Sequence, residues 1–221
     1  MNDLLKQFDK ETDDFKQYCE AFYNGELSPA EYKSKSGGFG TYAERGLKTG
    51  MLRLRIPAGE LTPARMKFIC DTIDKHKISK IHITTNQSIQ LHNLQCDSIY
   101  EIMKEALKQG IITRGGGGDY PRNALASPLS GVEKGEFFDV LPYAKAVSDY
   151  VLTLIGNVKL PRKLKIGFSN SPENIVHATY RDMGFAANKN NKFDLYTAGG
   201  LGVNPALGIK TAVDIEPKKV L

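Results

Sequence analysis

The segment GMLRLRIPAGELTPARM, residues 50–66, joins a strand pattern to a helix pattern. In its first half, leucine and isoleucine alternate with Arg53 and Arg55, which is the pattern of a half-buried β strand. A proline and a glycine end this strand. Thr62 is then a predicted N-cap, with Pro63 at the first helical position. The segment therefore predicts a strand followed closely by a helix.

The residues that follow extend this pair into a longer pattern. We predict strands at 78–85 (ISKIHITT) and 87–93 (QSIQLHN), a helix at 96–110 and a short strand at 111–114. The order strand, helix, strand, strand, helix, strand is the split βαβ or ferredoxin-like pattern. It occupies about residues 46–116.

The rest of the chain predicts a second domain after the glycine run Gly115–Gly118. A turn-rich loop leads to a helix, an alternating strand at 160–169, two strands joined by a polar turn at 188–192, and a glycine-rich loop. We expect an α+β protein with an N-terminal helical extension (1–45), a ferredoxin-like half-domain (46–118) and an α/β domain (119–221). The last residues, DIEPKKVL, read as the opening turn of a helix, so we expect the chain to be part of a longer protein.

Composition favours a protein of a reducing, cytoplasmic compartment. The 221 residues are 41% hydrophobic, and 30 basic against 25 acidic residues give a net charge of +5, which permits an anionic partner without requiring one. The N-terminus is too charged for a signal peptide, and no apolar run is long enough to span a bilayer. Cys19, Cys70 and Cys96 have no metal-ligand spacing, so we interpret them as buried structural thiols.

Cationic and amide side chains share the polar faces of three predicted strands. They are Arg53 and Arg55, then Ser88, Gln90 and His92, then Lys163 and Lys165, and the interdomain loop adds Arg122 beside Asn123. A charged outer face of an antiparallel sheet is ordinary, but solvated faces mix signs, and these lack Asp and Glu. Converging cations would suit a polyanionic ligand, namely phosphates, nucleic acid or a porphyrin-type cofactor with several carboxylates. The residues alone leave these alternatives open.

Six segments together resemble the sirohaem-dependent sulfite and nitrite reductases. The motifs GMLRLRIPAGELTPARM, ITTNQSIQLHN, DYPRNALASPLSG, LPRKLKIGFS, RDMGFAA and AGGLG occur in the order seen in that family, over about residues 40–210. The resemblance implies a ferredoxin-like half-domain followed by an α/β domain that cradles sirohaem. It also implies the six-electron reduction of sulfite to sulfide or of nitrite to ammonia, with the cofactor carrying the electron chemistry.

The resemblance also implies roles for individual residues. Arg53, Arg122, Lys163 and Lys165 match the catalytic cations around the substrate anion, with the two lysines supplying protons. Gln90 and His92 match a macrocycle-contacting pair, and Arg55, Asn123, Gly199 and Gly200 would be neighbours of the cofactor. Asn86 stands at a cofactor-binding position where the family usually has an arginine, so the chain lacks one cation that would contact either a sirohaem carboxylate or the substrate.

The three cysteines do not match the family's cluster ligands. The 4Fe-4S cluster needs four cysteines, which we expect beyond residue 221, so this piece alone should be inactive. The expected partners are sulfite or nitrite and an electron donor such as ferredoxin or a flavoprotein, with neither nucleic acid nor membrane. One alternative is a relative from cobalamin-type tetrapyrrole synthesis. Another is an RNA-binding ferredoxin-like module, which usually exposes aromatics that MLRLRIP and QSIQLHN lack.

Overall fold

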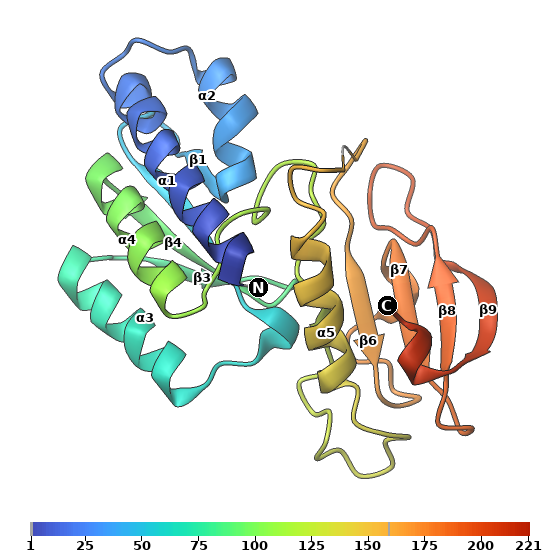
Figure 1. Cartoon of the computed structure of the whole chain (residues 1–221). Coiled ribbons are helices and arrows are strands. Elements are labelled where there is room, and N and C mark those ends of the chain that lie inside the picture. The colour runs from blue at the N-terminus through green and yellow to red at the C-terminus, as the bar shows by residue number, and fades with distance from the viewer. Residues whose placement is uncertain (1, 159) are drawn as a thin grey trace. The chain divides into compact units, whose positions relative to one another are not determined.

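The computed structural model describes residues 2–158 and 160–221, which divide into two compact units (Figure 1). The first unit holds residues 2–56 and 60–120 with Val158 and residues 160–163, and the second holds residues 57–59, 121–157 and 164–221. The helices before residue 45 lie inside the first unit. The predicted domain boundaries, 1–45, 46–118 and 119–221, stay predictions.

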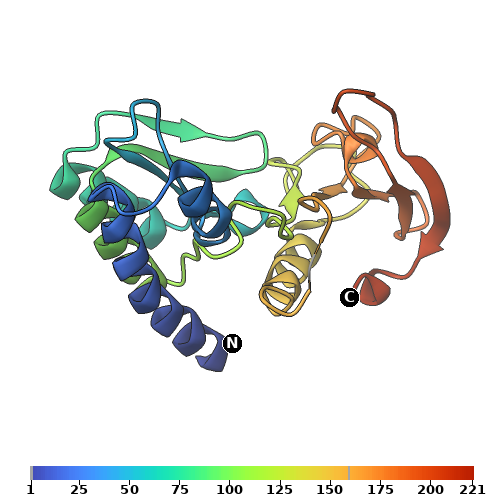
Figure 2. The same ribbon diagram turned by 90° about the horizontal axis from the view of Figure 1, so that it is seen from above.

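The first unit is a four-stranded antiparallel sheet with helices against one face (Figures 1 and 2). Its elements are α1 (Asn2–Tyr23), α2 (Pro29–Ser36), the 3₁₀ turn η1 (Gly37–Phe39), β1 (Thr41–Ala43), β2 (Gly50–Arg55), α3 (Pro63–His76), β3 (Ile81–Ile83), β4 (Ser88–Leu94) and α4 (Cys96–Lys108). The strand order is β1-β2-β4-β3. The apolar faces of β2 and β4 supply Leu52, Leu54 and Leu91 to a core that also contains Ile99 of α4. The predicted α+β class and ferredoxin-like pattern are confirmed.

Side-chain caps begin two helices of the first unit, and the predicted Thr62 cap is confirmed. The Ser28 hydroxyl accepts from the backbone N–H of Glu31, whose carboxylate accepts from the Ser28 N–H, so the two form a capping box. Thr62 caps α3 through the N–H of Arg65. The predicted strand at 111–114 is wrong. Only Ile112 bridges to Arg55, because β1 already pairs with the rest of that edge of β2.

The second unit is a five-stranded mixed sheet packed against one long helix. Its elements are the 3₁₀ turn η2 (Pro57–Gly59), β5 (Leu125–Ala126), α5 (Leu141–Leu152), β6 (Ile166–Ser169), η3 (Ala178–Tyr180), β7 (Met183–Ala187), β8 (Phe193–Thr197), β9 (Ile209–Ile215) and η4 (Pro217–Lys219). The strands follow chain order, with β5, β6 and β7 parallel and the remaining pairs antiparallel. Phe168, Phe185 and Phe193 meet in the core.

Two sequence predictions in this unit need correction. Strand β6 begins at Ile166, so Lys163 and Lys165 precede it, with Leu164 making a single bridge to Pro121. All four residues of β6 are buried because the strand is central and parallel to both neighbours, so it is not half-buried. At the end of the chain, β9 runs to Ile215 and only a 3₁₀ turn follows, where a helix was expected. Within residues 2–158 and 160–221, no helix is both long and apolar enough to cross a membrane.

Candidate functional site

A polar row crosses three strands of the first unit on the face opposite its apolar core. Arg53 of β2 is the register partner of Gln90 in β4, which also pairs with His82 of β3, and Arg55 pairs with Ser88. Residues directly opposite on antiparallel strands point to the same face, so these five side chains share one surface. No Phe, Tyr or Trp stands at these positions, and the row therefore lacks the stacking groups of an RNA-binding sheet.

Two glycine-rich segments, Gly37–Gly40 and Gly115–Gly118, pack backbone against backbone beside this row. We call the pair the glycine clasp. The Gly115 N–H donates to the Gly38 carbonyl at 2.8 Å, and the Gly118 N–H donates to the Tyr42 hydroxyl at 2.6 Å. A Cβ at Gly117 would lie 2.5 Å from the carbonyl oxygen of Gly37. The sequence predicted loops and a domain boundary here, but close backbone approach explains these glycines.

Arg53 is held by both segments of the clasp. Its backbone N–H donates to the Gly40 carbonyl at 2.8 Å, and its guanidinium donates to the Gly116 carbonyl. Burial lowers the pKa of Arg53 from its ordinary value, and none of the described carboxylates forms an ion pair with it. The result is a partly buried cation fixed by neutral carbonyl groups, which leaves its charge available to an anion.

Arg55 and His92 are also placed by interactions inside the first unit. Arg55 is 2% exposed, and its guanidinium donates to the Arg114 carbonyl at 3.4 Å. Nδ1 of His92 lies 2.7 Å from a carboxylate oxygen of Glu44, in the turn between β1 and β2. The buried Nε2 of His92 has no hydrogen-bond partner among the described residues. An imidazole held at one nitrogen and unsatisfied at the other fits the expected contact with a bound group.

Glu44 is the residue that orients this histidine. Burial alone would raise its pKa, but hydrogen bonds from His92, the Asn93 N–H and the Thr49 hydroxyl outweigh burial and lower it. The carboxylate is therefore ionised at neutral pH.

Asn86 lies in the turn that joins β3 to β4. The Gln87 N–H donates to the Thr84 carbonyl at 3.0 Å, and the Ser88 N–H donates to the Thr84 hydroxyl at 3.1 Å. Gln87 has a positive φ of 50°. This tight hairpin places Asn86 at the end of the strand that carries Gln90, so both predicted cofactor contacts come from one β hairpin.

Arg122 and Asn123 lie in the second unit, in the segment that leads into β5. The Arg122 N–H donates to the Leu164 carbonyl at 2.9 Å, and Asn123 is 1% exposed. Immediately after them, the Ala124 N–H donates to the Ser148 hydroxyl of α5 at 2.9 Å. The segment is thus fixed on one side by the residue Leu164, just before β6, and on the other by α5.

The predicted lysine pair does not share one strand face. Lys163 is exposed and belongs to the first unit by its contacts, whereas Lys165 is half-buried and belongs to the second. The Lys165 N–H donates to the Asp182 carboxylate at 2.7 Å, and its carbonyl accepts from Met183 at 3.2 Å. The ammonium group of Lys165 forms no ion pair with the described residues. It is therefore a second cation that the fold leaves uncompensated.

Gly199 and Gly200 differ in why they are glycines. A Cβ at Gly199 would lie 2.7 Å from the Thr179 carbonyl oxygen and 2.8 Å from that of Arg181, so local packing requires glycine there. A Cβ at Gly200 would meet nothing within 4 Å, although its backbone pairs with Ala206 at 2.9 Å in both directions. Of these two glycines, Gly200 is the one with open space beside it, where a bound group would fit.

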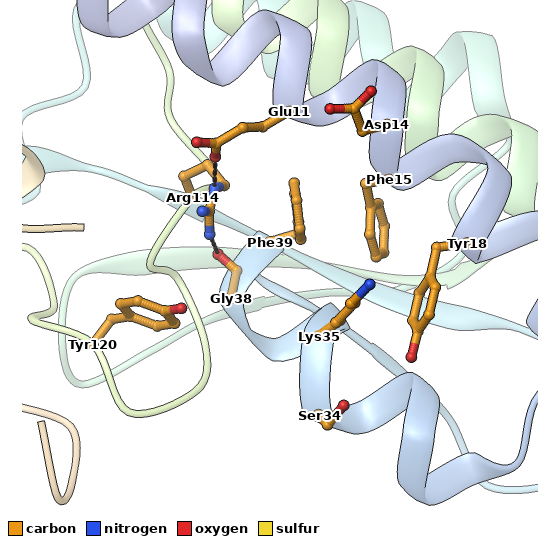
Figure 3. A pocket seen from close by; sticks show the side chains of 10 residues that line it. All are labelled: Glu11, Asp14, Phe15, Tyr18, Ser34, Lys35, Gly38, Phe39, Arg114 and Tyr120. Atoms are coloured by element: carbon orange, nitrogen blue, oxygen red, sulfur yellow. Dashed lines mark hydrogen bonds and ion pairs between the residues drawn. The ribbon is translucent and has the colours of Figure 1, made fainter. Parts of the chain in front are cut away.

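Figure 3 shows a pocket of about 330 Å³ in the first unit, which sequence reasoning missed. Its lining residues are Glu11, Asp14, Phe15, Tyr18, Ser34, Lys35, Gly38, Phe39, Arg114 and Tyr120. Arg114 stands over the Phe39 ring, pairs with Glu11, and donates to the Gly38 carbonyl at 2.6 Å. Arg114 thereby ties α1 to the clasp. The only sequence signal was a cation directly before four glycines.

The two units each hold a share of the predicted site. Arg53, Arg55, Asn86, Gln90, His92 and Lys163 lie in the first unit, and Arg122, Asn123, Lys165, Gly199 and Gly200 lie in the second. Convergence of the four cations stays a prediction. In both units, the predicted site residues offer hydrogen-bond donors. Within the described ranges, no cluster of three or more His, Cys, Asp or Glu could hold a metal ion. The chemistry of both shares suits an anion.

Two family models match the chain in succession. Residues 42–109 match the nitrite/sulfite reductase ferredoxin-like half domain, and residues 117–221 match the nitrite and sulphite reductase 4Fe-4S domain. A ferredoxin–nitrite reductase of Leptolyngbya laminosa is 29% identical over 163 residues, which are 72% of this chain and 31% of that protein. A sulfite reductase [NADPH] hemoprotein beta-component of Klebsiella pneumoniae is 27% identical over 184 residues, covering 71% of this chain and 32% of that protein.

Solved structures agree on the fold. The Mycobacterium tuberculosis NirA protein superposes with a TM-score of 0.77 at 23% identity, covering 98% of this chain and 44% of that one. A dissimilatory sulfite reductase I matches with a TM-score of 0.52 at 20% identity, covering 62% of this chain and 32% of that one. This chain thus spans about a third of the length of the curated relatives described above.

Proposed function

Because the chain belongs to the nitrite and sulfite reductase family, we propose that the enzyme containing it reduces nitrite to ammonia or sulfite to sulfide. The observation that carries this proposal is the succession of the two family regions, 42–109 and 117–221, which hold Arg53 and Lys165, two cations that form no ion pair with the described residues. Both substrates are small oxyanions, so the same cations would serve either one.

We further propose that these residues hold sirohaem, which supplies the electron chemistry when it is bound, together with a 4Fe-4S cluster whose ligands lie outside this chain. The residues of the chain fit a macrocycle with several carboxylates. Arg55 and Gln90 offer donors on the polar row, the buried Nε2 of His92 is unsatisfied, and Gly200 leaves open space. Asn86, at the usual arginine position, supplies an amide in place of a charge.

The arginines and the lysines would have different roles toward the substrate. Arg53 and Arg122 stay protonated at every physiological pH, so they would hold the oxyanion and stabilise negative charge that develops on it. Lysine can give up a proton, so Lys163 and Lys165 would supply protons as each substrate oxygen leaves as water. Reprotonation from solvent would restore both ammonium groups between steps, and Lys163, being exposed, has direct access to water.

The electron donor would be a ferredoxin or an NADPH-dependent flavoprotein. Ferredoxin appears in the name of the relative from Leptolyngbya, and NADPH appears in the name of the relative from Klebsiella. We place this enzyme in the cytoplasm.

The experiment that tests the proposal uses Lys165→Met and Lys165→Arg in the whole enzyme, prepared anaerobically with its cofactors. Reduction of nitrite and of sulfite is followed with a chemical electron donor, so that no partner protein is needed. Lys189→Met, which removes an exposed lysine of the β7–β8 turn, is the matched control.

We expect Lys165→Met to lower turnover of one of the two anions by about 10²-fold, Lys165→Arg to keep anion binding but lose most turnover, and Lys189→Met to match the wild type. Absence of a haem-like absorption band from the wild-type enzyme would overturn the cofactor assignment. Unchanged turnover in Lys165→Met would overturn the proposed role of Lys165 in proton supply and would leave the cofactor assignment untouched.

A further inference from the structure

Two cysteines of the first unit come from neighbouring helices. Cys19 lies on α1 and is 1% exposed, and Cys96 is the first residue of α4 and is partly exposed. Cys96 packs against the hydrophobic cluster that contains Cys19. The third cysteine, Cys70, is exposed on α3, so it is not the buried thiol that the sequence suggested.

The contacts between α1 and α4 set an antiparallel register that brings these two cysteines together. Asp9 pairs with Lys104 at 2.7 Å, and Asp13 accepts hydrogen bonds from Lys104 at 2.9 Å and from Tyr100 at 2.7 Å. One turn further along α1, Lys16 stands over the Tyr100 ring. The next turn of α1 and the preceding turn of α4 are the positions of Cys19 and Cys96, because helical neighbours recur every three or four residues.

The environment of the pair supports a thiolate. The Cys19 sulfur lies 3.5 Å from the hydroxyl of Tyr32, a residue that is 1% exposed. Hydrogen bonds from Cys96 and from Tyr32 lower the pKa of Cys19, and the same contact raises the pKa of Cys96. The Cys96 thiol and the Tyr32 hydroxyl therefore favour the ionised form of Cys19 over that of Cys96.

We propose that Cys19 and Cys96 form a reversible disulfide that joins α1 to α4 when the chain meets a small-molecule disulfide. Cys96 is the accessible partner and Cys19 is the resolving partner. Such transient disulfides are the usual kind in reducing compartments, and this one is independent of the reaction proposed above.

The exchange balances in two steps. The proton kept by the pair moves to Cys19, and the Cys96 thiolate attacks glutathione disulfide, forming a mixed disulfide and releasing one glutathione thiolate. The Cys19 thiolate then attacks the Cys96 sulfur, which forms the Cys19–Cys96 bond and releases the second glutathione thiolate. The two protons lost by the cysteines pass to these leaving thiolates. Two protein thiols are oxidised, and one glutathione disulfide is reduced to two thiols.

The position of the pair gives the disulfide a structural consequence. Helix α1 also carries Glu11, which holds Arg114 against Gly38 of the glycine clasp (Figure 3). Oxidation would fix α1 on α4 covalently and so keep Glu11 at the clasp. Reduction would leave the helix pair held by its packing, by the ion pairs of Lys104 and by the Tyr100–Asp13 hydrogen bond.

The test treats the folded 221-residue chain with glutathione disulfide and maps its peptides without reduction by mass spectrometry. We expect the three free thiols to disappear, with Cys19 joined to Cys96 and a glutathione retained at Cys70, which serves as the internal control. Dithiothreitol should then restore all three thiols. A stable mixed disulfide at Cys96 beside an unreacted Cys19, or pairing of Cys70 with either residue, would overturn the proposal.

Two variants separate the roles of the partners. In Cys19→Ser, Cys96 should keep its glutathione, because no resolving thiol is present. In Cys96→Ser, loss of the buried Cys19 thiol should slow by roughly ten-fold or more, since only the exposed partner gives the oxidant access. If Cys19 reacts equally fast without Cys96, the assignment of Cys96 as the accessible partner is wrong. A Cys70→Ser chain that still forms the disulfide would exclude transfer through Cys70.

Discussion

The two units hold their predicted cations in different ways. In the first unit, Arg53 lies within β2 and Arg55 ends it, and the backbone carbonyls of Gly116 and Arg114 accept from their guanidinium groups. In the second unit, Lys165 precedes β6, and its backbone N–H donates to the Asp182 carboxylate. Carbonyl groups thus hold the guanidinium groups of the first unit, whereas only the backbone of Lys165 is fixed and its ammonium group forms no ion pair with the described residues. Fixed cations suit binding, and adjustable ones suit proton transfer.

The largest expected effect comes from removing the best-fixed cation. Arg53→Ala in the whole enzyme should lower kcat/KM for the preferred anion by about 10²- to 10³-fold, because a preorganised donor is lost. Arg53→Lys should recover only part of this, since lysine lacks the planar guanidinium fork that donates to Gly116 with one nitrogen and leaves others for a substrate. Steady-state kinetics with a chemical donor measures both.

The control is Arg45→Lys, at an exposed position in the turn between β1 and β2. It should leave the kinetics unchanged. If Arg53→Lys also matches the wild type, the guanidinium geometry is not used, and the contrast between fixed and adjustable cations disappears.

The second effect concerns glycines that lie close to the predicted site residues in the sequence of each unit. Gly117→Ala in the first unit and Gly199→Ala in the second should each lower the free energy of unfolding by about 2 kcal/mol, because a methyl group would press on backbone oxygens. Gly200→Ala should cost less than about 0.5 kcal/mol, since nothing lies within 4 Å of its Cβ. Urea unfolding of the 221-residue chain measures all three.

Gly200→Ala also tests whether the second unit contacts the cofactor at this glycine. In the whole enzyme it should lower the amount of bound haem while the protein still folds. Normal haem content in this variant would remove Gly200 from the predicted cofactor contacts, and strong destabilisation would show that its glycine serves the loop instead.

Sequence reasoning succeeded where local pattern and local structure agree. The alternation around Arg53, the Thr62 cap of α3 and the polar turn between β7 and β8 all depend on residues close in the chain. The same alternation was misleading at Lys163 and Lys165. In a central parallel strand both faces are covered, so burial does not follow the alternation, and pairing with Met183 starts β6 only at Ile166.

The contacts that sequence reasoning missed join distant residues. Arg114 meets Gly38 across 76 positions, and His92 meets Glu44 across 48 positions. A glycine run is typical of a loop, of a hinge and of close backbone packing alike, so its meaning depends on the segment that packs against it. The clasp therefore became visible only when Gly37–Gly40 and Gly115–Gly118 were placed together.

A third and smaller effect is expected at the ion pair that ties α1 to the clasp. Glu11→Gln should lower the free energy of unfolding by about 1–2 kcal/mol, because the buried Arg114 loses its charged acceptor but keeps Gly38 and the Phe39 ring. Asp14→Asn, one turn further along the same pocket wall, forms no such pair and is the control. Equal stability of the two variants would contradict the role of Glu11.

The smallest effect is a pH dependence at Glu44, which holds His92 in the first unit. Because the folded pKa of Glu44 lies below its usual 4.5, the ionised carboxylate stabilises the fold at neutral pH, and this contribution is lost as the pH falls through the folded pKa. Glu44→Gln should therefore cost on the order of 1 kcal/mol at pH 7, and the difference from the wild type should shrink below about pH 4.5. Urea midpoints of the 221-residue chain between pH 7 and pH 3 measure it. A difference that stays constant across this range would mean that Glu44 acts through packing alone, and His92 would then not be held by charge.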